Sequence, residues 1–252
     1  MLASRDFSVA VSDVDGPAAE RAATEIGGSA WALTLDVTDP EACAAAAHAV
    51  VSRSGSLDVW VNNAGVLFPG VSYDQEPAAR RTMIDVNAIG TFNGTLAALD
   101  VMRRAGTGHV INVISLAGIV AAPGEVAYSA SKHAAIAFTI GTLADLRRMG
   151  IKGVDVSAVC PSGIWTPMLE DKLEDPNAAA SFSGTMHTPE QVAARMETIL
   201  DNPRPVLAIP RWRGAMVRTF DAFPRLMLRM LPLLLSDARR RQARFKRKLE
   251  RR

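Results

Sequence analysis

The chain has 252 residues, of which 48% are hydrophobic and 21% charged, which suits one α/β domain with an ordinary core and excludes a disordered chain. Its two cysteines, Cys43 and Cys160, lack the spacing of a disulfide framework or a metal site, so we expect no bound metal and a reducing, cytoplasmic compartment. The net charge of +2 hides an asymmetry: the residues from 211 onward hold 14 Lys/Arg and 3 Asp/Glu, whereas the preceding residues are net acidic.

Strand-like apolar runs alternate with helical patterns, which predicts a doubly wound, parallel, Rossmann-like α/β sheet with helices on both faces. The expected strands are Phe7–Ser12, Ala32–Leu35, Leu57–Asn62, His109–Ile114, Val154–Val159 and Val206–Ile209. The expected helices are Pro17–Ile26, Asp39–Arg53, Pro77–Arg104, Glu125–Met149 and a fifth from Thr188 to about Asn202. Residues 163–187 are poorly periodic and are predicted to form a mobile loop. We divide the chain into a domain over 1–210 and a basic, amphipathic helical extension over 211–252.

The first expected strand leads into Asp13, an acid at a strand end. In dinucleotide-binding βαβ units such an acid holds the adenosine ribose, and it follows a glycine-rich phosphate-binding turn by about 20 residues. Twelve residues precede Asp13, and none of them is glycine. The sequence therefore predicts an incomplete nucleotide site, without the usual first strand and its phosphate-binding turn.

Tyr128 and Lys132 lie four residues apart in the fourth expected helix, so both side chains leave the same face. A nearby ammonium lowers the pKa of a tyrosine, which can then exchange a proton with an alcohol or carbonyl oxygen. Taken alone, this spacing is more often an exposed helix face than a catalytic pair. Ser115 changes that balance, because it ends an expected strand thirteen positions earlier, where functional residues of open α/β sheets gather. A turn before Gly118 would also explain Ser115.

Three further segments place small or polar residues where this chemistry would need them. Asn62-Asn63-Ala64-Gly65 stands at the end of a buried strand. These small and amide residues form either a tight turn or a place where the backbone approaches a ligand closely. Asn87 interrupts the third expected helix, where asparagine has poor propensity, and is expected to bend the helix or to bind water. Asp36 follows the second strand, where it either caps the next helix or contacts an adenine ring.

In this order, these elements resemble the short-chain dehydrogenase/reductase family over residues 7–210. The resemblance implies a catalytic tetrad of Asn87, Ser115, Tyr128 and Lys132. It also implies cofactor contacts from Asp13 at the ribose, Asp36 and Val37 at the adenine, Asn63, Ala64 and Gly65 in the cofactor-side turn, Tyr128 and Lys132 near the nicotinamide ribose, and Pro161, Ile164 and Thr166 at the carboxamide. Two positions depart from frequent family residues: Ser162 stands where glycine is common, and Ile114 where serine is common.

The family implies hydride transfer between a nicotinamide cofactor and an alcohol or carbonyl carbon. In that scheme Tyr128 is the acid/base, Ser115 stabilises the substrate oxygen, Lys132 lowers the pKa of Tyr128, and Asn87 positions a water linked to Lys132. Asp13 would repel a 2′-phosphate, so NAD is expected in preference to NADP. Trp165, Met168 and Leu169 favour a lipophilic small-molecule substrate, and the resemblance implies a homo-oligomer.

The strand that the sequence lacks would be central in a doubly wound sheet. Without it, two inner strand edges stay unpaired and no helix N-terminus faces the cofactor pyrophosphate. We therefore expect Phe7–Ser12 and Leu57–Asn62 to lie apart. Three explanations stay open: Met1 is an internal residue of a longer protein, the gene is a decayed remnant, or the protein is a scaffold that works without a cofactor.

The basic extension begins with the apolar segment 220–235, which Arg225, Arg229 and two prolines make unfit to span a bilayer. Apolar residues beside basic clusters suit a peripheral contact with anionic lipid. The alternative is a helix that packs on the domain or on a partner subunit and ends in a solvated charged tip. The run Arg239–Arg252 lacks a recognition motif, so nucleic acid is not an expected partner.

Two hypotheses for function follow. The leading one is an oxidoreductase that transfers a hydride between NAD and an alcohol or carbonyl substrate. The other is a non-catalytic Rossmann-like scaffold, or a truncated remnant, that binds a partner or a membrane through its basic tail. They differ in whether Tyr128 exchanges a proton with a substrate.

Overall fold

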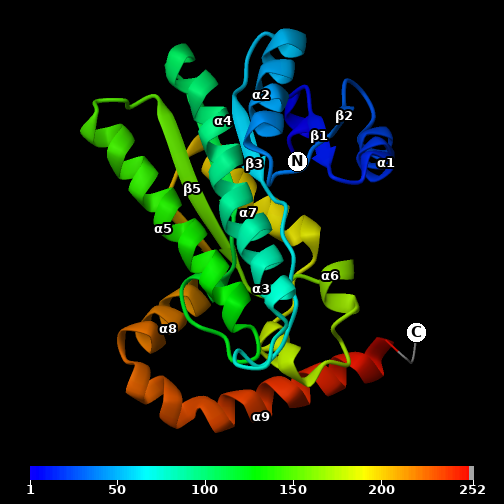
Figure 1. The fold of residues 1–252 in the computed structure, drawn as a ribbon, viewed down its shortest axis with the longest axis vertical. Helices are drawn as coiled ribbons and strands as arrows, with labels where there is room; N and C mark the ends of the chain where they lie inside the picture. Colours follow the sequence, from blue (N-terminus) through cyan, green and yellow to red (C-terminus); the bar gives the residue numbers. More distant parts are fainter. Residues whose placement is uncertain (250–252) are drawn as a thin grey trace.

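The computed structural model describes residues 1–249, in which parallel strands alternate with helices (Figure 1). The strands are β1 (Ala10–Asp13), β2 (Trp31–Thr34), β3 (Val59–Asn62), β4 (Gly108–Val113), β5 (Val154–Pro161) and β6 (Val206–Ile209). The α-helices are α1 (Gly16–Ile26), α2 (Pro40–Ser54), α3 (Pro77–Ile84), α4 (Gly90–Ala105), α5 (Val126–Arg148), α6 (Pro167–Glu170), α7 (Pro189–Asp201), α8 (Arg211–Ala222) and α9 (Pro224–Leu249). The predicted α/β fold with a Rossmann-like parallel sheet is confirmed.

Side-chain caps explain where three of the helices begin. Asp15 accepts a hydrogen bond from the backbone of Ala18 at the start of α1, and Asp39 does the same from Ala42 at the start of α2. At α7, Thr188 and Gln191 bond each other's backbone in a capping box. A proline follows each cap within two residues, where its fixed φ suits the first helical turn.

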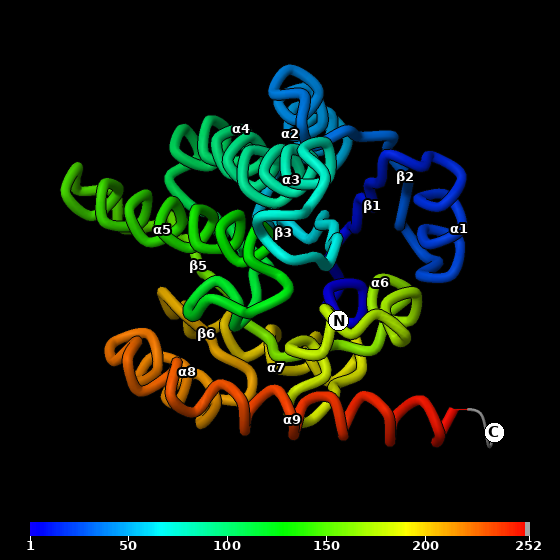
Figure 2. The backbone as a smooth tube through the Cα atoms, turned by 60° about the horizontal axis from the view of Figure 1, so that its bottom comes forward, coloured from blue at the N-terminus to red at the C-terminus, as the bar shows by residue number. Residues whose placement is uncertain are grey.

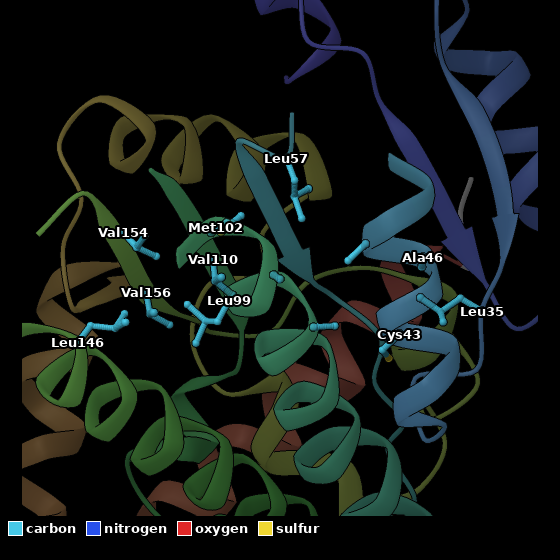
Figure 3. Close-up of a cluster of buried hydrophobic side chains, with 13 residues drawn as sticks. Leu35, Cys43, Ala46, Leu57, Leu99, Met102, Val110, Leu146, Val154 and Val156 are labelled. Atoms are coloured by element: carbon cyan, nitrogen blue, oxygen red, sulfur yellow. The ribbon is translucent and has the colours of Figure 1, made fainter. Parts of the chain in front are cut away.

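The sheet is divided into two parts. β1 pairs with β2, β3 begins a separate sheet in the order β3-β4-β5-β6, and no strand within residues 1–249 joins the two. The arrows of β1 and β3 run in similar directions, and a space separates them (Figure 3). A cavity of about 690 Å³ lies there, lined by apolar side chains such as Val11 and Val59 and by polar ones such as Arg5 and Asp58. The separation agrees with the expectation that these two strands lie apart.

Most of the core lies where helices cover the larger sheet. Val110 and Ile111 are neighbours on β4 but belong to different apolar clusters, because successive side chains of a strand point to opposite faces. On one face α4 and α5 cover Val110 and Val156, and α2 packs against α4 (Figure 3). On the other face α7 packs Ile199 against Ile111. This packing fixes the strand ends that carry the candidate site.

The segment 163–187 was expected to be an irregular, mobile loop, and the irregular part of that prediction was wrong. It contains α6 and a 3-10 helix, η4 (Pro176–Phe182). Asp175 caps η4 by accepting a hydrogen bond from Asn177, and Phe182 of η4 is almost fully buried. A short helix of this kind has too few turns to show helical periodicity in the sequence. We call residues 163–187 the substrate loop, after the expectation that Trp165, Met168 and Leu169 in it contact a substrate.

The basic extension forms α8 and α9, and the last three residues of the expected charged run, 250–252, lie outside the described part of the chain. Figure 2 shows α9 as a long rod across one side of the molecule, beside the substrate loop. Ala238 and Gln242 of α9 are buried against that loop. Within the described residues, no helix is long and apolar enough to cross a membrane, as the sequence predicted.

Candidate active site

Three strand ends and one helix form the candidate site. Gly65 lies shortly after β3, Ser115 follows β4, and Pro161 is the last residue of β5. Because parallel strands end at the same edge of a sheet, these three positions share that edge. Tyr128 and Lys132 lie in the first two turns of α5, which packs against β5 and against the 3-10 turn that follows Ser115.

Tyr128 and Lys132 leave the same face of α5, as their spacing predicts. The ammonium nitrogen of Lys132 lies 5.8 Å from the centre of the Tyr128 ring. It donates a hydrogen bond of 3.2 Å to the carbonyl of Val113, at the end of β4. Lys132 is only 4% exposed, and this is the one acceptor for its ammonium among the described residues. An ammonium has three donors, so two remain for a ligand or water.

Asn87 is the bend that the sequence predicted inside the long third helix. Residues 85–89 form one π-helical turn between α3 and α4, which buries Asn87 completely. Its amide nitrogen donates to the carbonyl of Val66 and to the hydroxyl of Ser131, and its oxygen accepts from the backbone of Val66. Both amide donors are therefore used within the protein. The water expected beside Asn87 stays a prediction.

Ser115 has its hydroxyl in a defined position at the start of a short 3-10 turn. Its Oγ accepts a hydrogen bond of 3.1 Å from the backbone of Ala117. That contact uses an oxygen lone pair and leaves the hydroxyl hydrogen free to donate. Ser115 also acts as a hydrogen-bond partner that lowers the pKa of Tyr128.

The net pKa shift of Tyr128 is opposite to the one expected from its spacing to Lys132. Burial raises the pKa of the phenol well above its usual range, and the nearby Glu125 adds to this, while Ser115 opposes it. Lys132 is not among the groups that set this shift. Burial also lowers the pKa of Lys132 to about 8. Desolvation of the phenol therefore outweighs any attraction between the Lys132 ammonium and the Tyr128 phenolate.

Glu125 is a buried acid that the sequence analysis did not single out. It is 2% exposed and accepts a hydrogen bond of 3.2 Å from the backbone of Ser181, in η4 of the substrate loop. Burial raises its pKa to about 7. A glutamate just before a helix normally indicates an exposed first turn, so nothing in the sequence pattern marked it as buried.

A second set of polar side chains that the sequence analysis missed lies beneath the site. The amide of Asn62, at the end of β3, donates to the side-chain oxygen of Asn112 over 2.7 Å. Asn112 in turn donates to Thr139 of α5, and Thr95 of α4 donates to the same oxygen of Asn112. These buried bonds tie β3 and β4 to the two helices that cover them. The sequence signal for these buried bonds is the presence of asparagine within otherwise apolar strands.

The cofactor-side residues predicted from the resemblance occupy several strand ends. Asn63 and Ala64 are exposed after β3, and a side chain at Gly65 would place a Cβ 3.5 Å from the ammonium of Lys132. Pro161 is buried, and Ile164 forms an isolated bridge with His187 at the ends of the substrate loop, close before Thr166.

The acids expected at the adenosine half lie after β1 and β2. Asp13 is exposed and accepts a hydrogen bond from the backbone of Asp15, so it stabilises the turn into α1. Asp36 accepts from both the backbone and the hydroxyl of Thr38. Val37 packs against the start of α4, where a Cβ on Gly90 would collide with it. Asp13 thus lies on the far side of the space between the two sheets, whereas Val37 lies against α4, which begins three residues after Asn87.

Comparison with known protein families supports the resemblance found in the sequence. The family pattern described as short chain dehydrogenase matches residues 1–177. The chain belongs to the short-chain dehydrogenase family. It is therefore an oxidoreductase by family, with Tyr128, Lys132, Ser115 and Asn87 as its candidate catalytic residues.

Three relatives of this short-chain dehydrogenase differ in the activities for which they are named. Cyclopentanol dehydrogenase of Comamonas testosteroni is 35% identical over 187 residues, covering 73% of this chain and 74% of the relative. Trans-4-hydroxycyclohexanecarboxylate dehydrogenase of Sinomonas cyclohexanicum is 40% identical over 134 residues, covering 53% and 50%. A Xanthobacter autotrophicus protein named inactive 2-(S)-hydroxypropyl-CoM dehydrogenase 2 is 35% identical over 194 residues, covering 73% and 83%.

Solved structures share the fold. Levodione reductase superposes with a TM-score of 0.74 at 25% identity, covering 85% of this chain and 90% of its own. A short-chain dehydrogenase/reductase from Burkholderia phymatum in complex with NAD gives a TM-score of 0.76 at 24% identity, covering 86% and 85%. Because the Burkholderia phymatum protein is only 24% identical, this likeness shows a shared fold and nothing more.

The residues present fit one half of a nicotinamide dinucleotide better than the other. Lys132 offers two unused donors beside the close backbone approach at Gly65, which suits a ribose diol. The phosphate half has no comparable cradle among residues 1–249, because no glycine-rich turn lines the space between β1 and β3. The N-terminus of α1 is occupied by the carboxylate of Asp15, which would repel a phosphate.

Proposed function

We propose that the protein is an NAD-dependent oxidoreductase acting on a small lipophilic alcohol or its carbonyl product, with Tyr128 as the acid/base. One observation carries the proposal. Tyr128 packs against an apolar cluster that includes Leu67, Trp165 and Phe182, while the ammonium of Lys132 lies 5.8 Å from its ring centre and Ser115 lowers the pKa of its phenol. A proton-exchanging group thus lies beside an apolar cluster.

Each of the chain's own residues has a separate role in the proposed reaction. The Ser115 hydroxyl, held by Ala117, donates to the substrate oxygen. Tyr128 accepts the alcohol proton during oxidation and returns it to the carbonyl oxygen during reduction. A nicotinamide cofactor, when bound, supplies or accepts the hydride at its ring. Because burial raises the pKa of Tyr128, the phenolate needs help from Lys132 once a ligand fills the site.

Lys132 and Asn87 support that exchange from opposite sides. Lys132 is held by Val113 at the end of β4, so its remaining donors reach a ribose and a water chain without moving. Asn87 is a positioning residue: it holds the backbone of Val66 against Ser131, which directly precedes Lys132 on α5. This bond fixes the loop that carries Gly65 relative to the catalytic helix.

The apolar cluster indicates the substrate class. Leu169 and Phe182 are buried in it, and Trp165 and Met186 are packed around them. Apolar walls around a single polar edge select a substrate with one hydroxyl or carbonyl on a hydrocarbon body. The relatives named for cyclopentanol and for a hydroxycyclohexane carboxylate act on such molecules, so cyclic secondary alcohols are the substrates to test first.

NAD is the preferred dinucleotide in this proposal. Asp13 is exposed at the end of β1, and Asp15 follows it closely. Two carboxylates at the place expected for the adenosine ribose would repel the 2′-phosphate of NADP.

We also propose a homo-oligomer and a cytoplasmic location. Leu96 of α4 and Ile140 of α5 are 55% and 42% exposed on neighbouring helices, next to a stacked pair of Phe92 and Phe138. An exposed apolar patch on two adjacent helices suits contact with a second copy. Leu96→Glu should shift the molar mass measured by light scattering to that of the monomer. An unchanged mass would contradict this contact.

The test of the chemistry uses the two tyrosines of the chain. Tyr128→Phe should abolish NAD-dependent oxidation of cyclopentanol, and Tyr73→Phe should not, because Tyr73 is 85% exposed outside the cluster. Thermal unfolding of both variants should match that of the wild type. Retained turnover in Tyr128→Phe would contradict the acid/base role. No turnover in the wild type with saturating cofactor and a panel of cyclic alcohols would favour the scaffold hypothesis.

A further inference from the structure

The helices α8 and α9 form an arm, residues 211–249, whose charge differs from that of the rest of the protein. Twelve of its residues are Lys or Arg and two are Asp. Its longer helix, α9, has 26 residues and is therefore about 39 Å long. Figure 2 shows α9 running past the substrate loop along one side of the molecule.

One side of the arm carries an exposed apolar stripe. Leu226, Met230 and Leu233 follow each other at steps of three or four residues, so they lie on one face of α9, and Phe223 precedes them at the junction of α8 and α9. All four are exposed, from 36% at Met230 to 72% at Leu233. We call these four residues the apolar stripe. Exposed side chains of this size and regular spacing indicate a surface that is covered in use.

The same side of α9 becomes basic toward its C-terminal half. Arg240, Arg244 and Arg247 continue the face of the stripe at helical spacing, and all three are exposed. Arg225 and Arg229 flank the stripe itself. An apolar strip bordered by arginine is the pattern of a helix that lies in the interface of a bilayer.

The opposite side of the arm holds the substrate loop. Gln242 donates hydrogen bonds of 3.0 and 2.9 Å to the carbonyls of Leu173 and Asp175. Phe245 meets the ring of Trp165 edge-on, with 4.6 Å between ring centres. Arg213 of α8 bonds the backbone and the hydroxyl of Ser183 at the end of the loop. The arm and the loop therefore form one packed unit.

We propose that this arm docks on the surface of an anionic lipid bilayer. The apolar stripe enters the headgroup region, and the arginines around it bind the anionic headgroups. Since the inner side of α9 holds the substrate loop, docking places the apolar cluster around Tyr128 close to the bilayer. A lipophilic substrate would then reach the site from the membrane. The docking itself does not depend on the proposed chemistry.

Charge favours a bilayer over the other surfaces that an amphipathic helix can cover. A second copy docked through the same face would bring two strongly basic arms together, which is unfavourable. Duplex DNA would attract the arginines, but it offers no apolar surface for Phe223 and Leu233. An anionic bilayer offers both charges and an apolar interior.

The test is co-sedimentation of the full chain with vesicles. We expect binding to vesicles of phosphatidylcholine with phosphatidylserine, weak binding to phosphatidylcholine alone, and release by salt. Replacing two interfacial arginines by glutamine, Arg240→Gln with Arg244→Gln, should weaken binding roughly thirtyfold. The matched control, Arg81→Gln with Arg195→Gln, removes two exposed arginines elsewhere and should change binding by less than about twofold.

A second pair of variants separates the stripe from general apolar exposure. Leu233→Ser should weaken vesicle binding about tenfold, because it removes one side chain from the interface. Leu228→Ser should leave binding unchanged, since Leu228 is 60% exposed but lies on the other side of α9. Circular dichroism of both variants should match that of the wild type.

Three results would overturn the proposal. The first is equal binding to both kinds of vesicle, or wild-type binding by the Arg240/Arg244 double variant. The second is displacement of the protein from vesicles by short duplex DNA at similar concentration, which would make nucleic acid the partner. The third is conversion of an oligomer into a monomer by Leu233→Ser without vesicles, which would assign the stripe to a second copy.

Discussion

Asn87 of the π-helical turn donates a 3.0 Å hydrogen bond to the hydroxyl of Ser131, and Ser131 donates in turn to the backbone carbonyl of Tyr128. The helix α5, which carries Tyr128, is therefore linked to the loop after β3 through one buried amide. The π-helical turn supplies this link, because it turns Asn87 inward between α3 and α4. Asn87 thus affects Tyr128 through position rather than through direct contact.

Asn87→Ala should cost about 1–3 kcal/mol of stability, because the backbone N–H of Val66 loses its acceptor in a buried place. We expect kcat to fall while KM for the alcohol changes little, since the substrate contacts no part of Asn87. Urea unfolding and steady-state kinetics measure the two effects. Asn202→Ala, at an exposed position, is the control and should change neither.

The sequence predicted some features around Asn87 and the strand ends, but not the partners of the buried amides. Poor helix propensity at Asn87 predicted a disturbance of the helix, and the structure has a π-helical turn there. The strand ends at Ser115 and Asn62 were also predictable, because apolar runs of four to six residues leave few alternatives. Which partner each buried amide selects was not predictable, since the bond from Asn62 to Asn112 joins residues fifty positions apart.

Glu125 makes stability depend on pH. Its folded-state pKa is raised to about 7 from an ordinary value of 4.5, so the stabilisation it gives is complete below pH 4.5 and is lost as pH rises through 7. Between pH 5 and 8 the free energy of unfolding should therefore decline by up to about 3 kcal/mol from this group. Glu125→Gln should remove most of that decline, whereas Glu76→Gln, at an exposed site, should preserve it. Identical pH profiles of wild type and Glu125→Gln would rule out this assignment.

The arm was harder to predict than the sheet. Its basic run stood out in the sequence, and packing on the domain was one of two alternatives. The contacts that decide its place come from Gln242 and Phe245, which look like ordinary residues of a charged helix. Their partners lie in the substrate loop, where short helices gave no periodic signal. Long-range pairing of two weakly patterned segments is beyond single-sequence periodicity.

Asp13 should control the choice between dinucleotides. Asp13→Asn removes the charge expected to repel a 2′-phosphate, so the ratio of kcat/KM for NADP to that for NAD should rise by about tenfold or more. Asp74→Asn, an exposed acid outside the site, is the control and should leave the ratio unchanged. A wild-type protein that already prefers NADP would show that Asp13 is not at the ribose.

The space between β1 and β3 should weaken cofactor binding. Because the described residues offer no phosphate cradle there, the adenosine half of NAD contributes little affinity. Calorimetry should give NAD a Kd less than about tenfold below that of nicotinamide mononucleotide, a difference under 1.4 kcal/mol. The unpaired strand edges should also promote aggregation, visible as a rising mass with concentration. Tight NAD binding by monodisperse protein would contradict this account.

The most direct test of the whole account follows one hydrogen atom. Cyclopentanol carrying deuterium on its carbinol carbon is incubated with the wild-type protein and saturating NAD, and the reduced cofactor is examined by mass spectrometry. The account predicts that the deuterium appears on the nicotinamide, that Tyr73→Phe transfers it equally, and that Tyr128→Phe does not. Transfer of the label by Tyr128→Phe at the wild-type rate would contradict the central claim.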